Sequence, residues 1–264
     1  MEKLLLPATH ERVKFFKALQ DHKARSQTGL YLLEGARLVR DAMLSAAPIA
    51  LLMVRAGDEG KYRDVIEYVQ LSGGQVFAGD DRALERACST KTPQGVCAAV
   101  LMPKDLRRVS GRYILALDHV KDPGNMGTIL RTAQAFGASC AVLSEGCCDP
   151  FAPKCVRSAM GAHFKLHIAF AEDLPALLFN YKVNRGYTVI GGHLNGHSTM
   201  PELNKNRICV IGGEANGMEE ATALACSALY RIPMPGKAES LNAAASASIL
   251  MWEMMRGGAP HGAG

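Results

Sequence analysis

Near its C-terminus the chain reads Ile232-Pro233-Met234-Pro235-Gly236-Lys237-Ala238-Glu239-Ser240-Leu241-Asn242. This stretch joins an expected apolar strand, residues 229–234, to an expected helix, residues 240–256. A loop between the end of a strand and the start of a helix presents backbone C=O and N–H groups that can hold a ligand. Taken alone, the stretch is better explained as a plain helix start with Ser240 as its cap. A function can therefore be assigned to this stretch only together with other motifs of the chain.

The composition is that of an ordinary folded protein. The 264 residues are 48% hydrophobic and 21% charged, which allows a sizeable core and most simply two domains. The formal net charge of +5 permits a polyanionic partner without requiring one.

The cysteines and the hydropathy pattern indicate a cytoplasmic protein. None of the eight cysteines lies in a C-x-x-C pair, so we expect reduced thiols packed as small apolar side chains, as in a reducing compartment. No apolar run reaches about 18 residues, so we expect no membrane span. The run of leucines at residues 4–6 is too short for the core of a signal peptide.

Strand and helix patterns alternate along the whole chain, which predicts an α/β fold. Residues 1–103 form a first α/β domain in this interpretation, and the charged stretch 103–111 is the expected domain boundary. Residues 111–257 form the second domain, where alternating strands and helices predict a parallel sheet covered on both faces.

Two further polar loops follow apolar strands in the second domain. The first, residues 118–127, contains Asn125 at an expected helix start, and Arg131 lies nearly two turns further on. In a parallel sheet, ligands bind beyond the carboxyl ends of the strands, so a buried-side Arg131 could hold a phosphate or a developing oxyanion. An ordinary turn with a solvated arginine explains the same residues about as well.

The second loop, residues 210–218, joins a buried strand to a Gly-Gly pair, Glu214 and an Asn-Gly turn. It is not G-x-G-x-x-G, because Glu214 stands where the second glycine belongs, and a phosphate-binding P-loop motif is absent from the sequence. The histidines lack the spacing of a metal site, so we expect no bound metal. A plain turn explains this loop too, when it is considered alone.

The three loops in this order resemble the SpoU (TrmH-like) family of RNA 2′-O-ribose methyltransferases, in the SPOUT superfamily. The first motif is Asn125-x-Gly127-x-x-x-Arg131-Thr132-Ala133, and the second is Gly212-x-Glu214-x-x-Gly217. The third motif is Ile232-Pro233-Met234-x-Gly236 with Ser240-Leu241-Asn242. The family usually has a serine two residues after this asparagine, and here that position is Ala244.

The resemblance implies an architecture and partners. It implies a C-terminal parallel-sheet domain with a deep trefoil knot, preceded by a smaller L30e-like domain that binds the RNA substrate. It also implies S-adenosylmethionine as cofactor and a homodimer whose active site uses both subunits. Ribosomal RNA of the 23S type is favoured over transfer RNA as the substrate.

The resemblance also implies roles for individual residues. Arg131 would activate the ribose hydroxyl, with Asn125 and Glu214 holding it in place and Ser240 and Asn242 positioning the substrate. The cofactor would meet a mostly backbone surface with apolar side chains, formed by Gly191, Gly212, Gly213, Gly217, Ile232, Met234 and Leu241. Two other functions stay open at this point. One is a non-catalytic RNA-binding protein of the same fold, and the other is a dinucleotide-dependent oxidoreductase, which the missing G-x-G-x-x-G disfavours.

Overall fold

The computed structural model describes residues 5–214, 216–236 and 240–256. The chain divides into two compact units, which are described separately. The N-terminal unit contains Met1–Pro103 together with Asp149–Phe164, and the C-terminal unit contains Lys104–Cys148 together with Lys165–Gly264. Among the described residues, no helix is both long enough and apolar enough to cross a bilayer.

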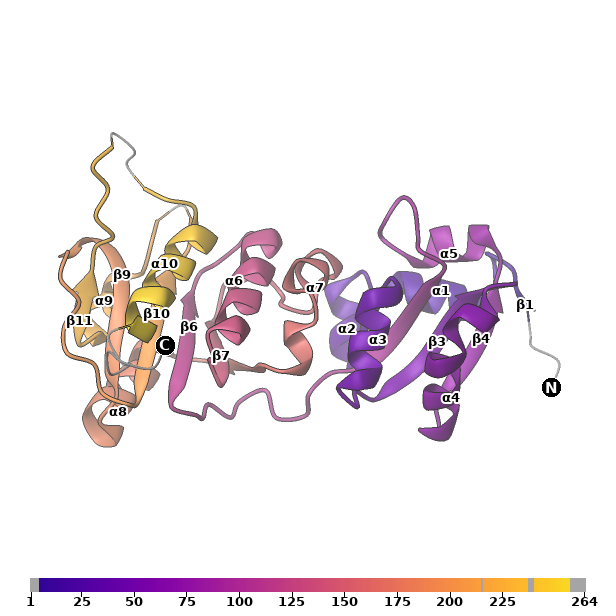
Figure 1. The fold of residues 1–264 in the computed structure, drawn as a ribbon, viewed down its shortest axis with the longest axis horizontal. Helices are drawn as coiled ribbons and strands as arrows, with labels where there is room; N and C mark the ends of the chain where they lie inside the picture. The colour runs from indigo at the N-terminus through magenta and orange to yellow at the C-terminus, as the bar shows by residue number, and fades with distance from the viewer. Residues whose placement is uncertain (1–4, 215, 237–239, 257–264) are drawn as a thin grey trace. The chain divides into compact units, whose positions relative to one another are not determined.

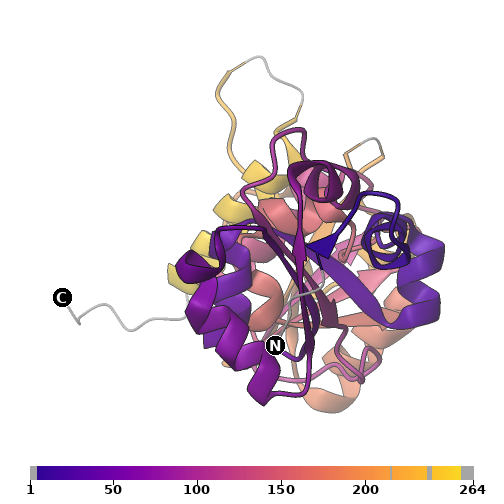
Figure 2. The ribbon, with the colours of Figure 1, turned by 90° about the vertical axis from the view of Figure 1, so that its right-hand side faces the viewer.

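The N-terminal unit is built on a mixed five-stranded sheet in the order β1-β4-β3-β5-β2. β5 runs antiparallel to both β2 and β3, whereas β1 and β3 are parallel to β4. Helices cover both faces: α1 and α5 pack on one, and α3 and α4 on the other (Figure 2). The strands are β1 (Leu5–Leu6), β2 (Leu30–Glu34), β3 (Ile49–Arg55), β4 (Gln75–Gly79) and β5 (Val96–Leu101). The helices are α1 (Glu11–Ala18), α2 (His22–Thr28), α3 (Ala36–Leu44), η1 (Glu59–Tyr62), α4 (Arg63–Leu71), α5 (Asp81–Ala87), α7 (Pro153–Ala159) and η2 (Ala162–Phe164).

The C-terminal unit has an all-parallel six-stranded sheet in the order β11-β9-β10-β6-β7-β8, which confirms the predicted parallel α/β architecture. Side chains alternate across it. Ile114 and Ala116 of β6 face α8 and α9, while α6 and α10 pack together on the opposite face (Figure 1). The strands are β6 (Tyr113–Asp118), β7 (Cys140–Ser144), β8 (His167–Ala171), β9 (Thr188–His197), β10 (Arg207–Gly212) and β11 (Ala228–Tyr230). The helices are α6 (Pro123–Ala135), α8 (Leu174–Arg185), α9 (Glu220–Ala225) and α10 (Ala243–Arg256).

One segment belongs to a different unit from the one that the sequence indicates. Residues 149–164 fall within the predicted second domain, 111–257, yet they pack in the N-terminal unit. The ring of Phe151 lies 5.2 Å from that of Tyr31, and the Arg25 guanidinium, 3% exposed, donates from Nε to Asp149 at 2.9 Å. Apolar periodicity shows that a helix has a buried face but does not show which core receives it.

His163 is a buried titratable group in this segment. Its Nε2–H donates to the carbonyl of Pro150 at 2.7 Å, and its ring lies among Tyr31 and Phe151. Nδ1 is buried and has no hydrogen-bond partner among the described residues. Burial lowers the pKa of His163 from 6.5 to about 4, because the charged ring would lose its hydration. The folded protein therefore holds this side chain neutral.

We expect this histidine to make the protein less stable in mild acid. Below the ordinary pKa of 6.5 the unfolded chain takes up a proton that the folded chain does not bind until about pH 4. Stability is thus lost as the pH falls through this window, by up to about 3 kcal/mol at full effect. Denaturant unfolding between pH 7.5 and 4 should show a shallower loss for His163→Gln, which keeps an N–H donor but does not titrate. Equal pH dependence in the two proteins would contradict the assignment.

Candidate functional site

The first loop leads into α6, which begins at Pro123, two residues before Asn125. Asp122 is the N-cap, and its Oδ1 accepts from the backbone N–H of Asn125 at 2.8 Å. Pro123 occupies the first helical position, where its missing N–H leaves no intrahelical bond unmade. Asn125 therefore lies within the first turn, half-buried, with its side chain free to reach other loops.

The second loop is a tight turn at the end of β10. Gly213 and Gly217 exchange two backbone hydrogen bonds of 3.0 Å, which fold the chain back on itself and leave Glu214 in the turn. A Cβ at Gly213 would lie 2.2 Å from the carbonyl oxygen of His119, so only glycine fits there. β10 pairs in register with β6, Gly212 opposite Asp118, and the first two loops therefore leave the sheet side by side.

The third loop differs from its prediction at both ends. β11 ends at Tyr230 rather than at residue 234, since Pro233 and Pro235 have no N–H to donate to a strand partner. α10 begins at Ala243, and its cap is Asn242 instead of Ser240. The Asn242 Oδ1 accepts from the backbone N–H groups of residues 244 and 245 at 2.9 and 3.3 Å. Residues 237–239 of the opening stretch lie outside the described part of the chain.

Hydrogen bonds between side chains join the three loops. Asn125 donates from Nδ2 to Glu214 Oε1 at 2.7 Å, and its Oδ1 accepts from Asn242 Nδ2 at 3.0 Å. We call Asn125, Glu214 and Asn242 the loop cluster. Each amide uses its donor and its acceptor, so the cluster specifies one orientation of both asparagines. Three residues that the sequence singled out separately thus lie together.

A cavity of about 450 Å³ opens beside the second and third loops. Six of the seven predicted cofactor residues line it, together with Glu214 and Ser240. These six are Gly212, Gly213, Gly217, Ile232, Met234 and Leu241. The C-terminal half of β9 forms another wall through His193, Leu194 and Asn195.

Gly191 is the exception among the predicted cofactor residues. A Cβ there would lie 2.7 Å from Met218 and 2.9 Å from Cys226, on the side of the sheet that carries α8 and α9. The neighbouring Gly192 lines the cavity instead. Successive residues of a strand face opposite sides of the sheet, so an error of one position reverses the face.

Ser246 provides a hydroxyl near the position where the family usually has a serine and this chain has Ala244. Ala244 is buried near the start of α10, whereas Ser246 lines the cavity. A hydroxyl is therefore present in the first turn of α10 although the residue two after Asn242 is alanine.

Arg131 does not lie where a buried-side arginine was expected. It is exposed on α6, does not line the cavity, and forms no hydrogen bond or ion pair with any residue that the structure describes. Six residues along a helix correspond to a rotation of about 240°, so Arg131 faces about 120° away from Asn125. Its guanidinium is available to a group from outside this chain.

His119 lines a second cavity, at the ends of β6, β7 and β8. The buried Asp118 holds its Nδ1 at 2.8 Å and accepts from the backbone N–H of Glu219 at 2.8 Å. The side chains of Asp118, His119 and Glu219 each place one possible metal-ligand atom within 4.8 Å of the other two. Asp118 thereby ties the end of β6 to the start of α9. The expectation of no bound metal stays a prediction.

A family model for the SpoU rRNA Methylase family matches residues 112–252, which contain all three loops. The chain belongs to this family. A model for an MRM3-like substrate binding domain matches residues 10–98. The chain is 32% identical to the 23S rRNA (guanosine(2553)-2′-O)-methyltransferase RlmP of Bacillus subtilis, over 94% of this chain and 97% of that protein.

Solved methyltransferase structures share the fold over nearly the whole chain. An AdoMet-bound rRNA methyltransferase from Sinorhizobium meliloti matches with a TM-score of 0.85 at 30% identity, covering 97% of this chain and 99% of that one. The SpoU methyltransferase AviRb from Streptomyces viridochromogenes, in complex with AdoMet, matches with a TM-score of 0.81 at 25% identity, covering 94% and 97%. The resemblance read from the sequence is therefore confirmed at the level of family and of parallel α/β fold.

Replacing Asn242 should separate its two structural roles. Asn242→Ala loses both the α10 cap and the link to Asn125, and we expect a loss of about 1 kcal/mol in the free energy of unfolding. Asn242→Asp keeps a capping oxygen but cannot donate to Asn125, so it should retain most of that stability. Urea unfolding of both variants measures the difference. A stability for Asn242→Ala equal to that of the unchanged protein would contradict the capping role.

Proposed function

We propose that this chain is an S-adenosylmethionine-dependent methyltransferase that acts on a ribose 2′-hydroxyl in RNA, with 23S-type ribosomal RNA as substrate. The observation that carries the proposal is the loop cluster, in which Asn125 and Asn242 are linked to Glu214, a wall residue of a cavity of suitable size. The identity to RlmP over almost the full length of both proteins supports ribosomal RNA and the 2′-oxygen.

The cavity suits S-adenosylmethionine in size and in chemistry. Its volume of about 450 Å³ is within the ordinary range for a small-molecule site. Leu194, Ile232, Met234 and Leu241 supply apolar surface for an adenine ring. Gly212, Gly213 and Gly217 supply backbone groups for polar atoms. The carboxylate of Glu214 at the wall favours a ligand that carries positive charge.

In the proposed reaction the protein contributes positioning and charge. When bound, S-adenosylmethionine would supply the methyl group: a C–O bond to the ribose 2′-oxygen forms as the C–S bond breaks, S-adenosylhomocysteine leaves, and the hydroxyl proton passes to water. Glu214 and Asn242 fix the Asn125 amide, and this cluster orients the ribose. A guanidinium is a poor general base, so the role of Arg131 is to stabilise negative charge on the 2′-oxygen and to bind a neighbouring phosphate. Ser240, at the cavity wall, positions the substrate.

We further propose a homodimer that completes this site. Ile249 and Trp252 of α10 are 36% and 44% exposed, and the Trp252 ring lies 6.0 Å from that of Phe136 at the end of α6. Exposed apolar residues on α10, beside the half-buried Phe136, favour burial against another protein surface. In this proposal a second copy packs there and supplies its Arg131 to a cavity that this chain's own Arg131 does not line.

The finer architecture is part of the same proposal. We assign residues 1–103 to an L30e-like domain that binds the RNA substrate. We assign residues 111–257, apart from the segment 149–164 that packs in the N-terminal unit, to a SPOUT domain with a deep trefoil knot. The match of residues 10–98 to the MRM3-like substrate binding domain supports the first assignment, and the similarity to AviRb supports the second.

The proposed site of action is the cytoplasm, where ribosomal RNA is the substrate. Transfer RNA is the second candidate, supported by relatives named tRNA/rRNA methyltransferases. A non-catalytic RNA-binding role is disfavoured because the loop cluster is intact.

Arg131→Ala should abolish methyl transfer while leaving cofactor binding unchanged. We expect the rate with unmodified 23S RNA to fall about 100- to 1,000-fold, as for loss of a charge-stabilising donor. Tritium-methyl incorporation measures transfer, and calorimetry measures affinity for S-adenosylmethionine. Arg185→Ala, on α8, is the matched control. Undiminished transfer by Arg131→Ala would remove it from the reaction.

Leu241→Glu should weaken cofactor binding by at least about tenfold, because a carboxylate replaces apolar surface in the cavity wall. Calorimetry with S-adenosylhomocysteine, which lacks the sulfonium charge, avoids an attraction that could mask the loss. Leu224→Glu is the control, since Leu224 is 76% exposed on α9 and does not line the cavity. Equal affinities in the two variants would show that Leu241 does not contact the cofactor.

A further inference from the structure

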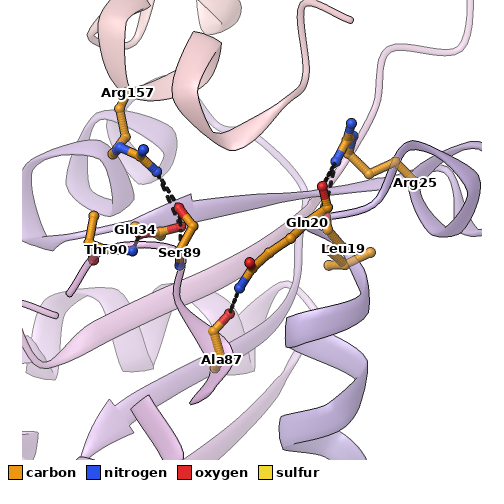
Figure 3. Close-up of polar contacts among 8 residues, drawn as sticks. All are labelled: Leu19, Gln20, Arg25, Glu34, Ala87, Ser89, Thr90 and Arg157. Atoms are coloured by element: carbon orange, nitrogen blue, oxygen red, sulfur yellow. Dashed lines mark hydrogen bonds and ion pairs between the residues drawn. The ribbon is translucent and has the colours of Figure 1, made fainter. Parts of the chain in front are cut away.

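The N-terminal unit holds one exposed loop, residues 89–95, unusually firmly. Glu34, at the end of β2 and 8% exposed, accepts three hydrogen bonds from it. The donors are the Ser89 N–H at 2.9 Å, the Ser89 hydroxyl at 2.7 Å and the Thr90 N–H at 3.1 Å (Figure 3). A single buried carboxylate therefore fixes the first half of this loop.

Arg157 of α7 completes this anchor. Its Nη1 donates to the Ser89 hydroxyl and lies 3.5 Å from Glu34 Oε1, so the carboxylate has a positive partner (Figure 3). About one third of the Arg157 side chain remains exposed. The guanidinium thus neutralises Glu34 and presents part of its surface to solvent beside the loop.

The second half of the loop is held from other elements. The hydroxyl of Tyr62 donates to the carbonyl of Gln94 at 2.9 Å, and Arg55 donates to the carbonyl of Pro93 at 3.4 Å. The Gln94 side chain lies over Gly35, where a Cβ would come within 2.8 Å of its Oε1. Both ends of the loop are therefore fixed by side chains of the same unit.

What the loop exposes is polar. Ser89, Lys91, Thr92 and Gln94 are exposed, whereas Gly95, which follows them, is buried. Ordering a backbone costs roughly 1–2 kcal/mol per residue, and these exposed side chains bury little apolar surface in return. An ordered polar loop of this kind is suited to binding, because a partner then meets donors that are already in place.

We propose that loop 89–95 and Arg157 form a contact surface for the sugar–phosphate backbone of the RNA substrate. This inference rests on the proposed function. Lys91 supplies positive charge for phosphates, and the exposed part of the Arg157 guanidinium supplies further N–H donors. The Thr92 hydroxyl and the Gln94 amide can pair with ribose 2′-hydroxyls and base edges. Glu34 is a positioning residue: it fixes the loop backbone and does not touch the RNA.

The test measures RNA binding by the full-length protein. Filter binding of unmodified 23S RNA, transcribed in vitro, should show a Kd raised about tenfold for Lys91→Ala and for Gln94→Ala. For Lys91→Ala the dependence of log affinity on log salt should also become shallower by about 1. Lys205→Ala is the matched control, because Lys205 is exposed before the start of β10, at the end of the sheet opposite the cavity.

A second variant tests the positioning role. Glu34→Gln keeps the size of the side chain but loses the carboxylate, so amide hydrogen exchange in residues 89–95 should speed up while RNA affinity falls. Affinity for S-adenosylhomocysteine should not change in any of these variants. If Glu34→Gln fails to fold, the Lys91 and Gln94 variants still decide the question, since those side chains are exposed.

The outcomes separate this inference from the proposed function. If the unchanged protein methylates 23S RNA and the Lys91 and Gln94 variants bind that RNA with unchanged Kd, the contact surface is wrong and the function stands. If the unchanged protein neither binds nor methylates 23S or transfer RNA, the proposed function fails, and this inference fails with it. Weaker binding by both variants, with Lys205→Ala unaffected, supports the surface.

Discussion

The candidate site depends on one side chain, Asn125, which hydrogen-bonds to two other loops at once. Its amide donates to Glu214 and accepts from Asn242, residues that lie 89 and 117 positions away. Asn242 is in turn fixed because its own oxygen caps α10. These bonds align the turn after β10 with the start of α10 at the cavity wall. The loop cluster therefore links the three loops structurally and is also part of the proposed active site.

The register of the parallel sheet makes the contact between these loops possible. β6 and β10 are neighbouring strands in register, and Asp118 pairs with Gly212, so both strands end at the same level. Glycine then allows close approach, since a side chain at Gly213 would collide with the carbonyl of His119. The cavity lies beyond these carboxyl ends, as is general for open parallel sheets.

Much of the site could be predicted from the sequence, because the three motifs carry a family resemblance that implies which residues form the site. Glu214, Met234 and Leu241 were placed at the cavity in this way. Two residues lie elsewhere than expected for the same physical reason: the motif does not show which way a residue faces on its strand or helix. Gly191 was chosen where Gly192 faces the cavity, and Arg131 was expected on a buried face that the helix turns away from the site.

The sequence alone determined the family, the parallel α/β class and the three loops, because ordered motifs and apolar periodicity are local properties of a chain. Only the tertiary structure decided that Asn242 caps α10, that Ser246 lines the cavity and that residues 149–164 pack in the N-terminal unit. It alone also revealed Glu34 and Arg157 as joint anchors of loop 89–95. These contacts join residues far apart in the chain, and long-range pairing leaves no periodic trace in the sequence.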